Sequence, residues 1–188
     1  MHLNLITGRL YRKFARFWNS PFITGSRIWL RKIVDEMKII DFLSPETILT
    51  RMKSTDKDGA IKELSDAVSV FTGIESEKIV SVILERERLG STGIGGGIAI
   101  PHGKLKKLDR MVIGFGRSDK GVRFDSLDGK PVFIFWLLLS PYDSTGLHLR
   151  LLARIAKLMK DDEFKKKLMD AKSPEDVIHS IEAEDREI

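Results

Sequence analysis

The chain has 188 residues, of which 42% are hydrophobic and 31% are charged, a composition typical of a folded globular protein rather than a disordered or fibrous one. It contains no cysteine, which excludes disulfides, thiolate metal sites and a cysteine nucleophile. Its four histidines leave little material for a metal site, so we expect neither a metal nor a cofactor.

The net charge of +5 belongs to the first part of the chain. Of the 32 basic and 27 acidic side chains, residues 1–36 carry seven and two, which leaves 25 of each for residues 37–188. A balanced main part has no broad basic footprint of the kind that binds nucleic acid. We therefore expect no nucleic-acid partner.

Residues 1–36 are basic and aromatic, and Pro21 and Gly25 interrupt them. Their apolar runs are too short to span a membrane, and the interspersed arginines do not fit a secretory signal. This segment can be an extension outside the domain, with Met37 as the natural start, a segment on an anionic membrane surface, or the site of another interaction. We take the first interpretation, with a cytoplasmic domain over residues 37–188; any membrane contact would come through residues 1–36.

Two helices are predicted after Met37. The first begins at Asp56 or Asp58 and continues to about Phe71, with apolar residues at helical spacing. The second runs over about 76–89. A glycine follows each segment, where helices commonly end.

Strands are predicted next. A glycine-rich run at 93–97 is followed by a short strand over 98–100. Buried strands are expected at Met111–Phe115 and Val132–Leu139, the second because it is a nearly continuous apolar run of the kind found inside a sheet. Asp128-Gly129 between them marks a turn.

Three further helices are expected, at about Thr145–Lys160, Asp162–Ala171 and Ser173–Ala183. Strands and helices in this order predict a single α/β domain with helices packed on a central sheet.

The glycine-rich run at 93–97 does not fit a nucleotide-binding loop. A dinucleotide fingerprint follows a strand and opens a helix, whereas here a helix precedes and a strand follows. No Gly-Lys-Ser/Thr triplet completes a P-loop. We therefore expect a turn with positive φ angles.

His102 lies between Pro101 and Gly103, directly after the strand at 98–100. Proline favours an extended preceding residue, and glycine permits unusual backbone geometry and leaves room around the imidazole. A histidine at a sheet rim is well placed for chemistry. From this motif alone, however, an ordinary loop histidine is the more typical interpretation.

A longer stretch carries a family resemblance. Residues 85–104, ERERLGSTGIGGGIAIPHGK, closely resemble the active-site signature of the fructose/mannitol/nitrogen-regulatory class of phosphotransferase system enzyme IIA domains. MKIIDFL at 37–43 and LHLRLL at 147–152 are also similar to this family, so the resemblance covers roughly residues 37–185. It implies the mannitol-type enzyme IIA fold, an α/β domain with a central mixed β-sheet flanked by helices. GSTGIG at 90–95 is closest to the nitrogen-regulatory branch.

The resemblance implies roles for several side chains. His102 would accept a phosphoryl group from a phosphohistidine on a small carrier protein, His148 would contact the phosphoryl oxygens, and Arg86 would lie beside the phosphohistidine. Neutral imidazole is a competent nucleophile near neutral pH, and a planar guanidinium suits phosphoryl oxygens. Ser91 and Thr92 are weaker candidates for phosphoryl binding, because turns after helices commonly carry such residues.

From pattern alone, other interpretations of these residues stay open. His148 falls on an apolar helix face and can be a core histidine near the helix start. Arg86 can extend its charge to solvent or meet the dipole at the end of its helix. At Gly96 the family usually carries a polar residue, so this chain lacks one side-chain hydrogen bond near the site.

The function implied is that of a bacterial phosphocarrier, and hence of a phosphotransferase. In one branch the phosphorylation state decides which regulated target proteins are bound; in another, the phosphoryl group passes to the B domain of a fructose/mannitol-type sugar permease. Without a cysteine or a B-type segment in this chain, that acceptor would be a separate protein. A third possibility is a binding module without phosphotransfer. We expect the regulatory branch, with a histidine-containing phosphocarrier protein as donor.

Overall fold

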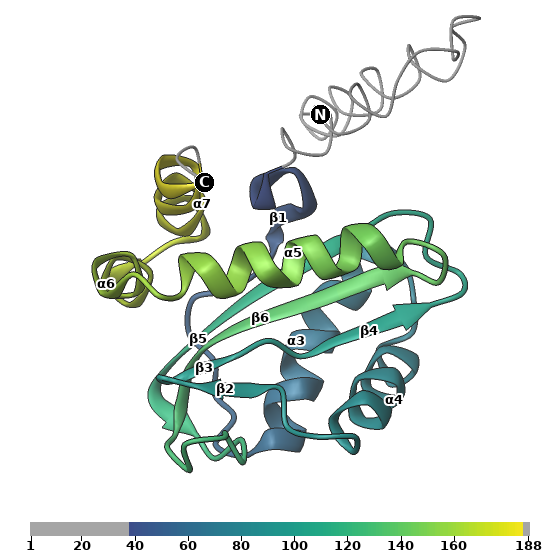
Figure 1. The fold of residues 1–188 in the computed structure, drawn as a ribbon, viewed down its shortest axis with the longest axis horizontal. Coiled ribbons are helices and arrows are strands. Elements are labelled where there is room, and N and C mark those ends of the chain that lie inside the picture. The colour runs from purple at the N-terminus through teal and green to yellow at the C-terminus, as the bar shows by residue number, and fades with distance from the viewer. Residues whose placement is uncertain (1–37, 186–188) are drawn as a thin grey trace, which may run out of the picture. The chain divides into compact units, whose positions relative to one another are not determined.

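Six strands form one mixed sheet within residues 38–185, the part of the chain that the computed structural model describes (Figure 1). The predictions for residues 1–36 lie outside this part. The elements are η1 (Ile39–Phe42), β1 (Leu43–Leu49), α3 (Lys57–Thr72), α4 (Ser76–Glu87), β2 (Gly93–Gly95), β3 (Ile98–Ala99), β4 (His102–Leu105), β5 (Val112–Val122), β6 (Val132–Pro141), α5 (Thr145–Leu158), α6 (Asp162–Asp170) and α7 (Pro174–Glu184).

The antiparallel pair β5–β6 is the centre of the sheet, in the order β1-β5-β6-β3-β2. β1 runs parallel to β5, β3 runs parallel to β6, and β2 is antiparallel to β3. β4 also pairs with β6 in parallel, further along it than β3, since Ile100-Pro101 separates the two short strands. The sheet is therefore mixed, as expected.

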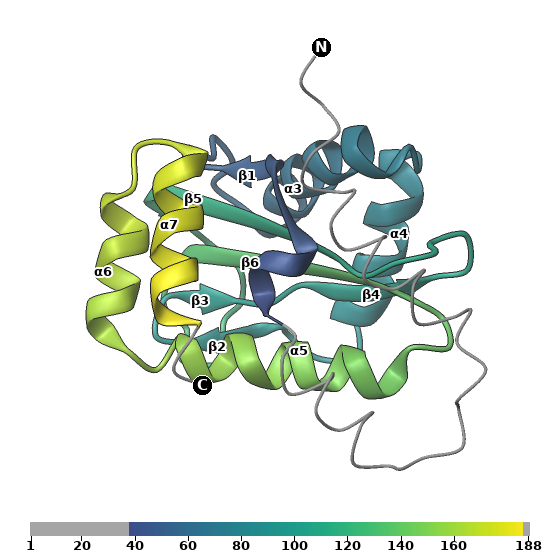
Figure 2. The ribbon, with the colours of Figure 1, turned by 90° about the horizontal axis from the view of Figure 1, so that it is seen from above.

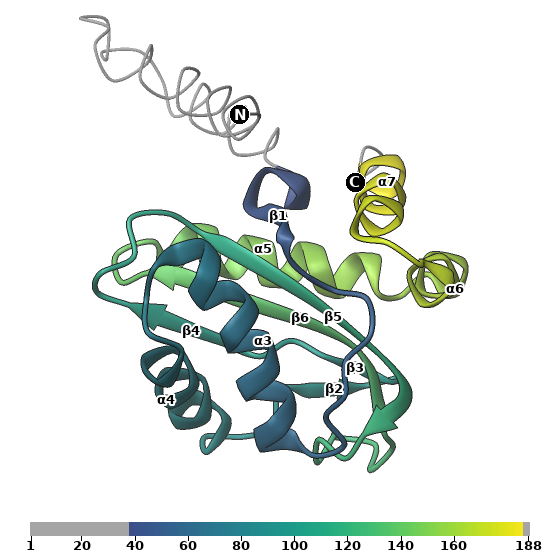
Figure 3. The ribbon, with the colours of Figure 1, turned by 180° about the vertical axis from the view of Figure 1, so that it is seen from behind.

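Helices cover both faces of this sheet. Figures 1 and 3 show α5 on one face and α3 with α4 on the other, while Figure 2 shows α6 and α7 beyond one end of α5. Alternate residues of β6 serve the two layers: Trp136 and Leu138 pack with α5, α6 and α7, whereas Phe135 and Leu137 pack with α3 and α4. Of the helices in residues 38–185, none combines the length and apolarity needed to cross a bilayer.

Helix ends follow the capping residues in the sequence. The Asp56 side chain accepts a hydrogen bond from the Gly59 amide at the start of α3, and Gly73 ends this helix with a φ of 70°. The Ser173 hydroxyl accepts from the Asp176 amide before α7. The predicted bounds of these two helices are thus confirmed to within one residue, whereas α4 ends at Glu87, two residues before the expected Leu89.

Several strands differ from the prediction, among them β4, which was not predicted. β5 continues to Val122, although Phe115 was the expected end, because the buried Arg117 finds partners inside the fold. Its guanidinium donates to the carbonyl oxygens of Thr50 and Met169. β1 was not predicted, since LSPETIL combines proline and glutamate in a way that is unusual for a strand.

The glycine-rich run has the expected positive φ angles, at Gly95, Gly96 and Gly97. Its first residues nevertheless form β2, which pairs with β3. The Asp128 carboxylate accepts a hydrogen bond from the Gly96 amide, and the predicted turn at Asp128-Gly129 is present. The run is therefore tied to the turn between β5 and β6.

Candidate active site

His102 is the first residue of β4 and is partly buried. In the pairing of β4 with β6 it lies opposite Leu138, and the Leu138 amide donates to the carbonyl oxygen of Pro101. The strand break at Pro101 thus places the imidazole between the end of α4 and the start of α5. This position agrees with the prediction of a histidine at a sheet rim.

Hydrogen bonds assign the protons of the His102 ring. Nδ1 lies 2.8 Å from the carbonyl oxygen of Ile100, an acceptor only, so Nδ1 carries the proton. Nε2 lies 2.9 Å from Nε of Arg86, which is always a donor, so Nε2 holds the lone pair. The two partners together select one neutral tautomer, with Nε2 as the nucleophilic nitrogen.

Gly103 has a structural role different from the one expected. Its φ is not positive. A side chain at this position would instead meet α4, because an added Cβ would lie 2.5 Å from Cγ1 of Val82 and 3.3 Å from Cδ1 of Ile83. The glycine therefore permits the close approach of α4 to β4, which brings Arg86 to His102.

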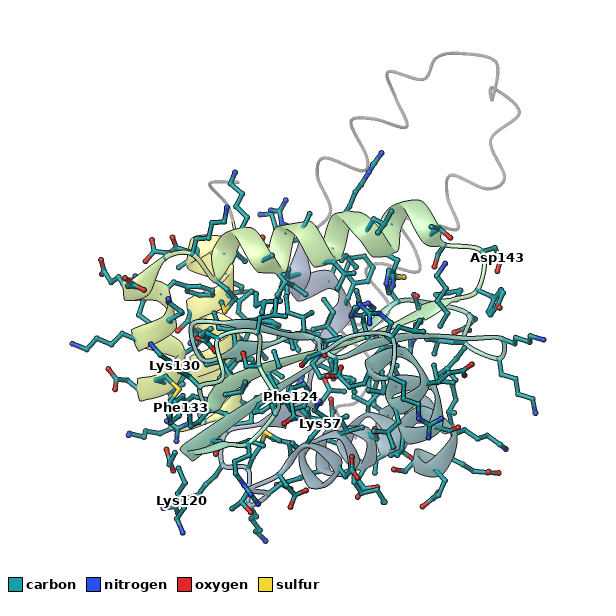
Figure 4. The ribbon with its side chains drawn as sticks, turned by 60° about the horizontal axis from the view of Figure 1, so that its bottom comes forward. Lys57, Lys120, Phe124, Lys130, Phe133 and Asp143 are labelled. Atoms are coloured by element: carbon teal, nitrogen blue, oxygen red, sulfur yellow. The ribbon has the colours of Figure 1, made fainter. Side chains whose placement is uncertain are left out.

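Arg86 lies in the last turn of α4, and its Nη1 donates to the carbonyl oxygen of Gly90 at 3.1 Å. The α4 exit (residues 87–92), which follows it directly, contains a buried carboxylate. Glu87 accepts hydrogen bonds from the Thr92 amide at 3.0 Å and from the Thr92 hydroxyl at 2.6 Å. Lys57, seen beside Phe124 in Figure 4, lies 3.3 Å from the same carboxylate.

The hydroxyls of Ser91 and Thr92 have partners within this part of the fold. The Ser91 hydroxyl donates to the Phe124 carbonyl oxygen and accepts from the Gly93 amide, and Thr92 is bound to Glu87. Neither hydroxyl is hydrogen-bonded to the His102 ring. Their contact with a phosphoryl group stays a prediction.

His148 lies in the first turn of α5, where its amide donates to the carbonyl oxygen of Ser144. Ser144 precedes the helix, but its hydroxyl donates to the Pro141 carbonyl oxygen and does not cap the helix. Asp143 marks this connection in Figure 4. The His148 ring is 5% exposed and packs edge-on against that of His102, with centroids 5.3 Å apart. The structure thus brings His102, His148 and Arg86 together.

Both histidines favour the neutral form. Burial lowers the pKa of His102, and the nearby charge of Arg86 lowers it further. Burial also lowers the pKa of His148 from 6.5 to about 4, helped by His102 and by the positive charges of Lys104 and Arg86. Near neutral pH the site therefore offers an uncharged nucleophile, an uncharged second imidazole and a permanent cation.

Three further residues of the site were not singled out from the sequence. Glu87 could have been noticed, because an acidic residue is unfavourable in the last turn of a helix unless it has partners. Lys104 donates from Nζ to the Thr145 hydroxyl at 2.6 Å, and Ser140 lies 2.9 Å from Nδ1 of His148. Lys104 and Ser140 pair across β4 and β6, and no local pattern reveals such a register.

Within residues 38–185, no three side chains of the His, Cys, Asp or Glu type are grouped as a metal site would require. The chemistry available in this part is that of a partly buried imidazole whose unprotonated nitrogen faces an arginine. Such a nitrogen can take up an electrophilic group whose negative charges the neighbouring donors would balance.

The chain belongs to the EIIA 2 family of the phosphoenolpyruvate-dependent sugar phosphotransferase system, whose family model matches residues 41–184.

Among individual proteins, it is 43% identical over 132 residues to a nitrogen regulatory protein of Bradyrhizobium diazoefficiens, a match that covers 70% of this chain and 86% of the relative. It is 34% identical to the fructose-specific EIIABC component of Bacillus subtilis, over 80% of this chain and 24% of that protein. The crystal structure of the nitrogen regulatory protein IIA-Ntr from Neisseria meningitidis superposes with a TM-score of 0.72 at 31% identity, covering 76% of this chain and 98% of that one. The mannitol IIA of Escherichia coli, 22% identical, shares the fold with a TM-score of 0.62 over 73% of this chain and 97% of that one.

Proposed function

We propose that the protein is a phosphocarrier that accepts a phosphoryl group on Nε2 of His102 from a phosphohistidine of a carrier protein and then passes it on. The observation that carries this proposal is the pair of hydrogen bonds that places the proton on Nδ1 and the lone pair on Nε2. The lowered pKa of His102 supports it, because the ring is neutral and nucleophilic near neutral pH.

The transfer needs no net proton movement at His102. The N–P bond of the donor breaks and its electron pair returns to the donor imidazole, while the Nε2 lone pair forms the new N–P bond. The product ring keeps its proton on Nδ1 and gains positive charge, which the Ile100 carbonyl oxygen stabilises. A cationic ring is a good leaving group, so the phosphoryl group can be passed on.

Arg86 has two positions in this scheme. Its Nε now donates to Nε2 of His102 and so occupies the lone pair that must attack phosphorus. As the new bond forms, the guanidinium moves to the phosphoryl oxygens, which a planar donor fork suits. Catalysis of such a transfer consists mostly of positioning and charge stabilisation.

The regulatory branch is supported by the relatives. Nitrogen regulatory proteins match this chain along 86% and 90% of their own length, whereas the fructose-specific EIIABC component matches along 24%. In this branch, the phosphorylation state of His102 sets which target proteins are bound. A sugar-transport role would instead require transfer to the B domain of a fructose- or mannitol-type permease.

The test is to incubate the protein with a phosphorylated histidine-containing carrier from the same genome and to locate acid-labile, base-stable label by mass spectrometry. We expect label on His102, none in His102→Ala, and full labelling of the control His179→Ala, which changes an exposed histidine. Label that persists in folded His102→Ala would disprove the assignment. Rapid passage of the label to a fructose-type B domain would favour sugar transport.

A further inference from the structure

Ser140 lies beside the candidate active site, in a place where its hydroxyl has two possible partners. It is fully buried on β6 and pairs with Lys104 of β4. Its Oγ lies 2.9 Å from Nδ1 of His148 and 3.4 Å from the carbonyl oxygen of Gly103. In residues 38–185 no other side chain is hydrogen-bonded to the His148 ring.

The direction of this hydroxyl determines what His148 can do. A neutral imidazole carries one N–H, so the partner of Nδ1 decides which nitrogen holds it. If Ser140 donates to Gly103, it accepts from Nδ1–H, and Nε2 presents a lone pair that repels phosphoryl oxygens. If Ser140 donates to Nδ1, the proton resides on Nε2, which can then donate a hydrogen bond to those oxygens.

We propose that Ser140 is a positioning residue that donates its hydroxyl hydrogen to Nδ1 of His148 and thereby keeps the proton on Nε2, ready for the phosphoryl group on His102. The 3.4 Å contact with the Gly103 carbonyl oxygen is longer than an ordinary O–H···O hydrogen bond, whereas the 2.9 Å contact with Nδ1 has an ordinary length, so the geometry favours donation to Nδ1. The strand pairing and the first turn of α5 hold the two residues in register. This inference rests on the proposed function of His102.

The wild-type protein provides a direct test, because ring ¹⁵N chemical shifts distinguish the two neutral tautomers of histidine. We expect His148 to show protonated Nε2 and unprotonated Nδ1 near neutral pH, with its signals identified by their loss in His148→Gln. In Ser140→Ala the two tautomers should mix. A wild-type His148 with its proton on Nδ1 would overturn the inference, whatever the variants do.

Transfer kinetics supply the second test, with potassium phosphoramidate as a small P–N donor that needs no docking partner. Since one hydrogen bond is at stake, Ser140→Ala should slow labelling of His102 about five- to tenfold. It should cause no further loss in a His148→Ala background, because it acts through His148. Equal slowing in both backgrounds would show that Ser140 acts on the fold and not through His148.

Ser65→Ala is the matched control, since Ser65 is also fully buried and its hydroxyl has no hydrogen-bond partner in residues 38–185. It should label at the wild-type rate. If wild-type protein takes up no label from either the carrier or phosphoramidate, the proposed function fails. If wild-type and Ser140→Ala label equally fast, the proposed function stands and the role of Ser140 is refuted.

Discussion

The two helices that meet at His102 hold their functional side chains by different means. At the α4 exit, Arg86 binds the Gly90 carbonyl oxygen, and the buried Glu87 ties the following turn to Thr92 and Lys57. At the start of α5, the His148 ring has one hydroxyl partner. Within residues 38–185, the turn after Arg86 is thus held by several hydrogen bonds and an ion pair, whereas the His148 ring has a single side-chain hydrogen bond.

The two sides also differ in charge. Arg86 carries a permanent positive charge at the nucleophile, while the pKa of about 4 keeps His148 neutral near neutral pH. Under the proposed function, the arginine would balance the charge of a phosphoryl group, and the histidine would contribute a neutral, directional donor. Because His148 is neutral, it does not add a second positive charge that would lower the pKa of His102 further.

The largest effects should come from removing either donor. Arg86→Ala and His148→Ala should each slow transfer by about 10²–10³, the cost of losing one donor to developing charge. Arg86→Lys should also be impaired, because an ammonium lacks the bidentate fork, and His148→Gln should be milder than His148→Ala. Single-turnover transfer from the carrier measures these rates, with thermal melts as the check on folding. Wild-type rates in both alanine variants would assign these side chains to packing alone.

A smaller effect should follow from loosening the α4 exit. Glu87→Ala leaves buried donors of Thr92 without an acceptor and should reduce the free energy of unfolding by about 2–3 kcal/mol, while Glu87→Gln keeps one acceptor and should lose less. Urea unfolding measures both variants, and Glu85→Ala on the exposed side of α4 should change stability by less than about 0.5 kcal/mol.

The rate of transfer in Glu87→Ala bears directly on the comparison of the two sides. If the network positions Arg86, the folded variant should transfer more slowly than wild type, by about tenfold or less. An unchanged rate would mean that Arg86 needs only Gly90.

A separate effect, on stability alone, is a pH dependence that belongs to His148. Its pKa is about 4 in the folded protein and 6.5 ordinarily, so the unfolded chain binds more protons between these values. Stability should therefore fall as the pH decreases from about 6.5 to about 4, and this part of the decrease should be absent in His148→Gln. Thermal melts of both proteins across this range give two profiles of stability against pH. The contributions of the other titrating groups are common to both profiles, so the difference between them reports His148. Parallel stability profiles of the wild type and His148→Gln would contradict the lowered pKa of His148.

Much of the fold was predictable because local signals agree with it. Asp56 and Gly73 delimit α3, and the apolar run at Val132–Leu139 is the central strand β6. β1 and the second half of β5 were missed because their polar residues are satisfied only by distant parts of the chain, as Arg117 is by Thr50.

The site was predictable to a similar extent. The motif Pro101-His102-Gly103 drew attention to His102, but its role, like those of Arg86 and His148, came from the family resemblance. Ser140 and Lys104 enter the site through the register of β4 with β6, which depends on the assembled sheet. The sequence thus located the three candidate side chains, and the structure places Ser140 and Lys104 beside them.

The close packing at Gly103 means that a substitution at this position can change the distance between Arg86 and His102. The spacing between arginine and nucleophile is set by how near α4 can approach β4, and residue 103 is the spacer between them. A methyl group there, with or without a smaller side chain at position 82, would change that spacing without replacing Arg86 or His102. The strength with which the arginine holds the resting nucleophile could therefore be adjusted from the opposite face of the sheet, by volume alone and without altering a single charge.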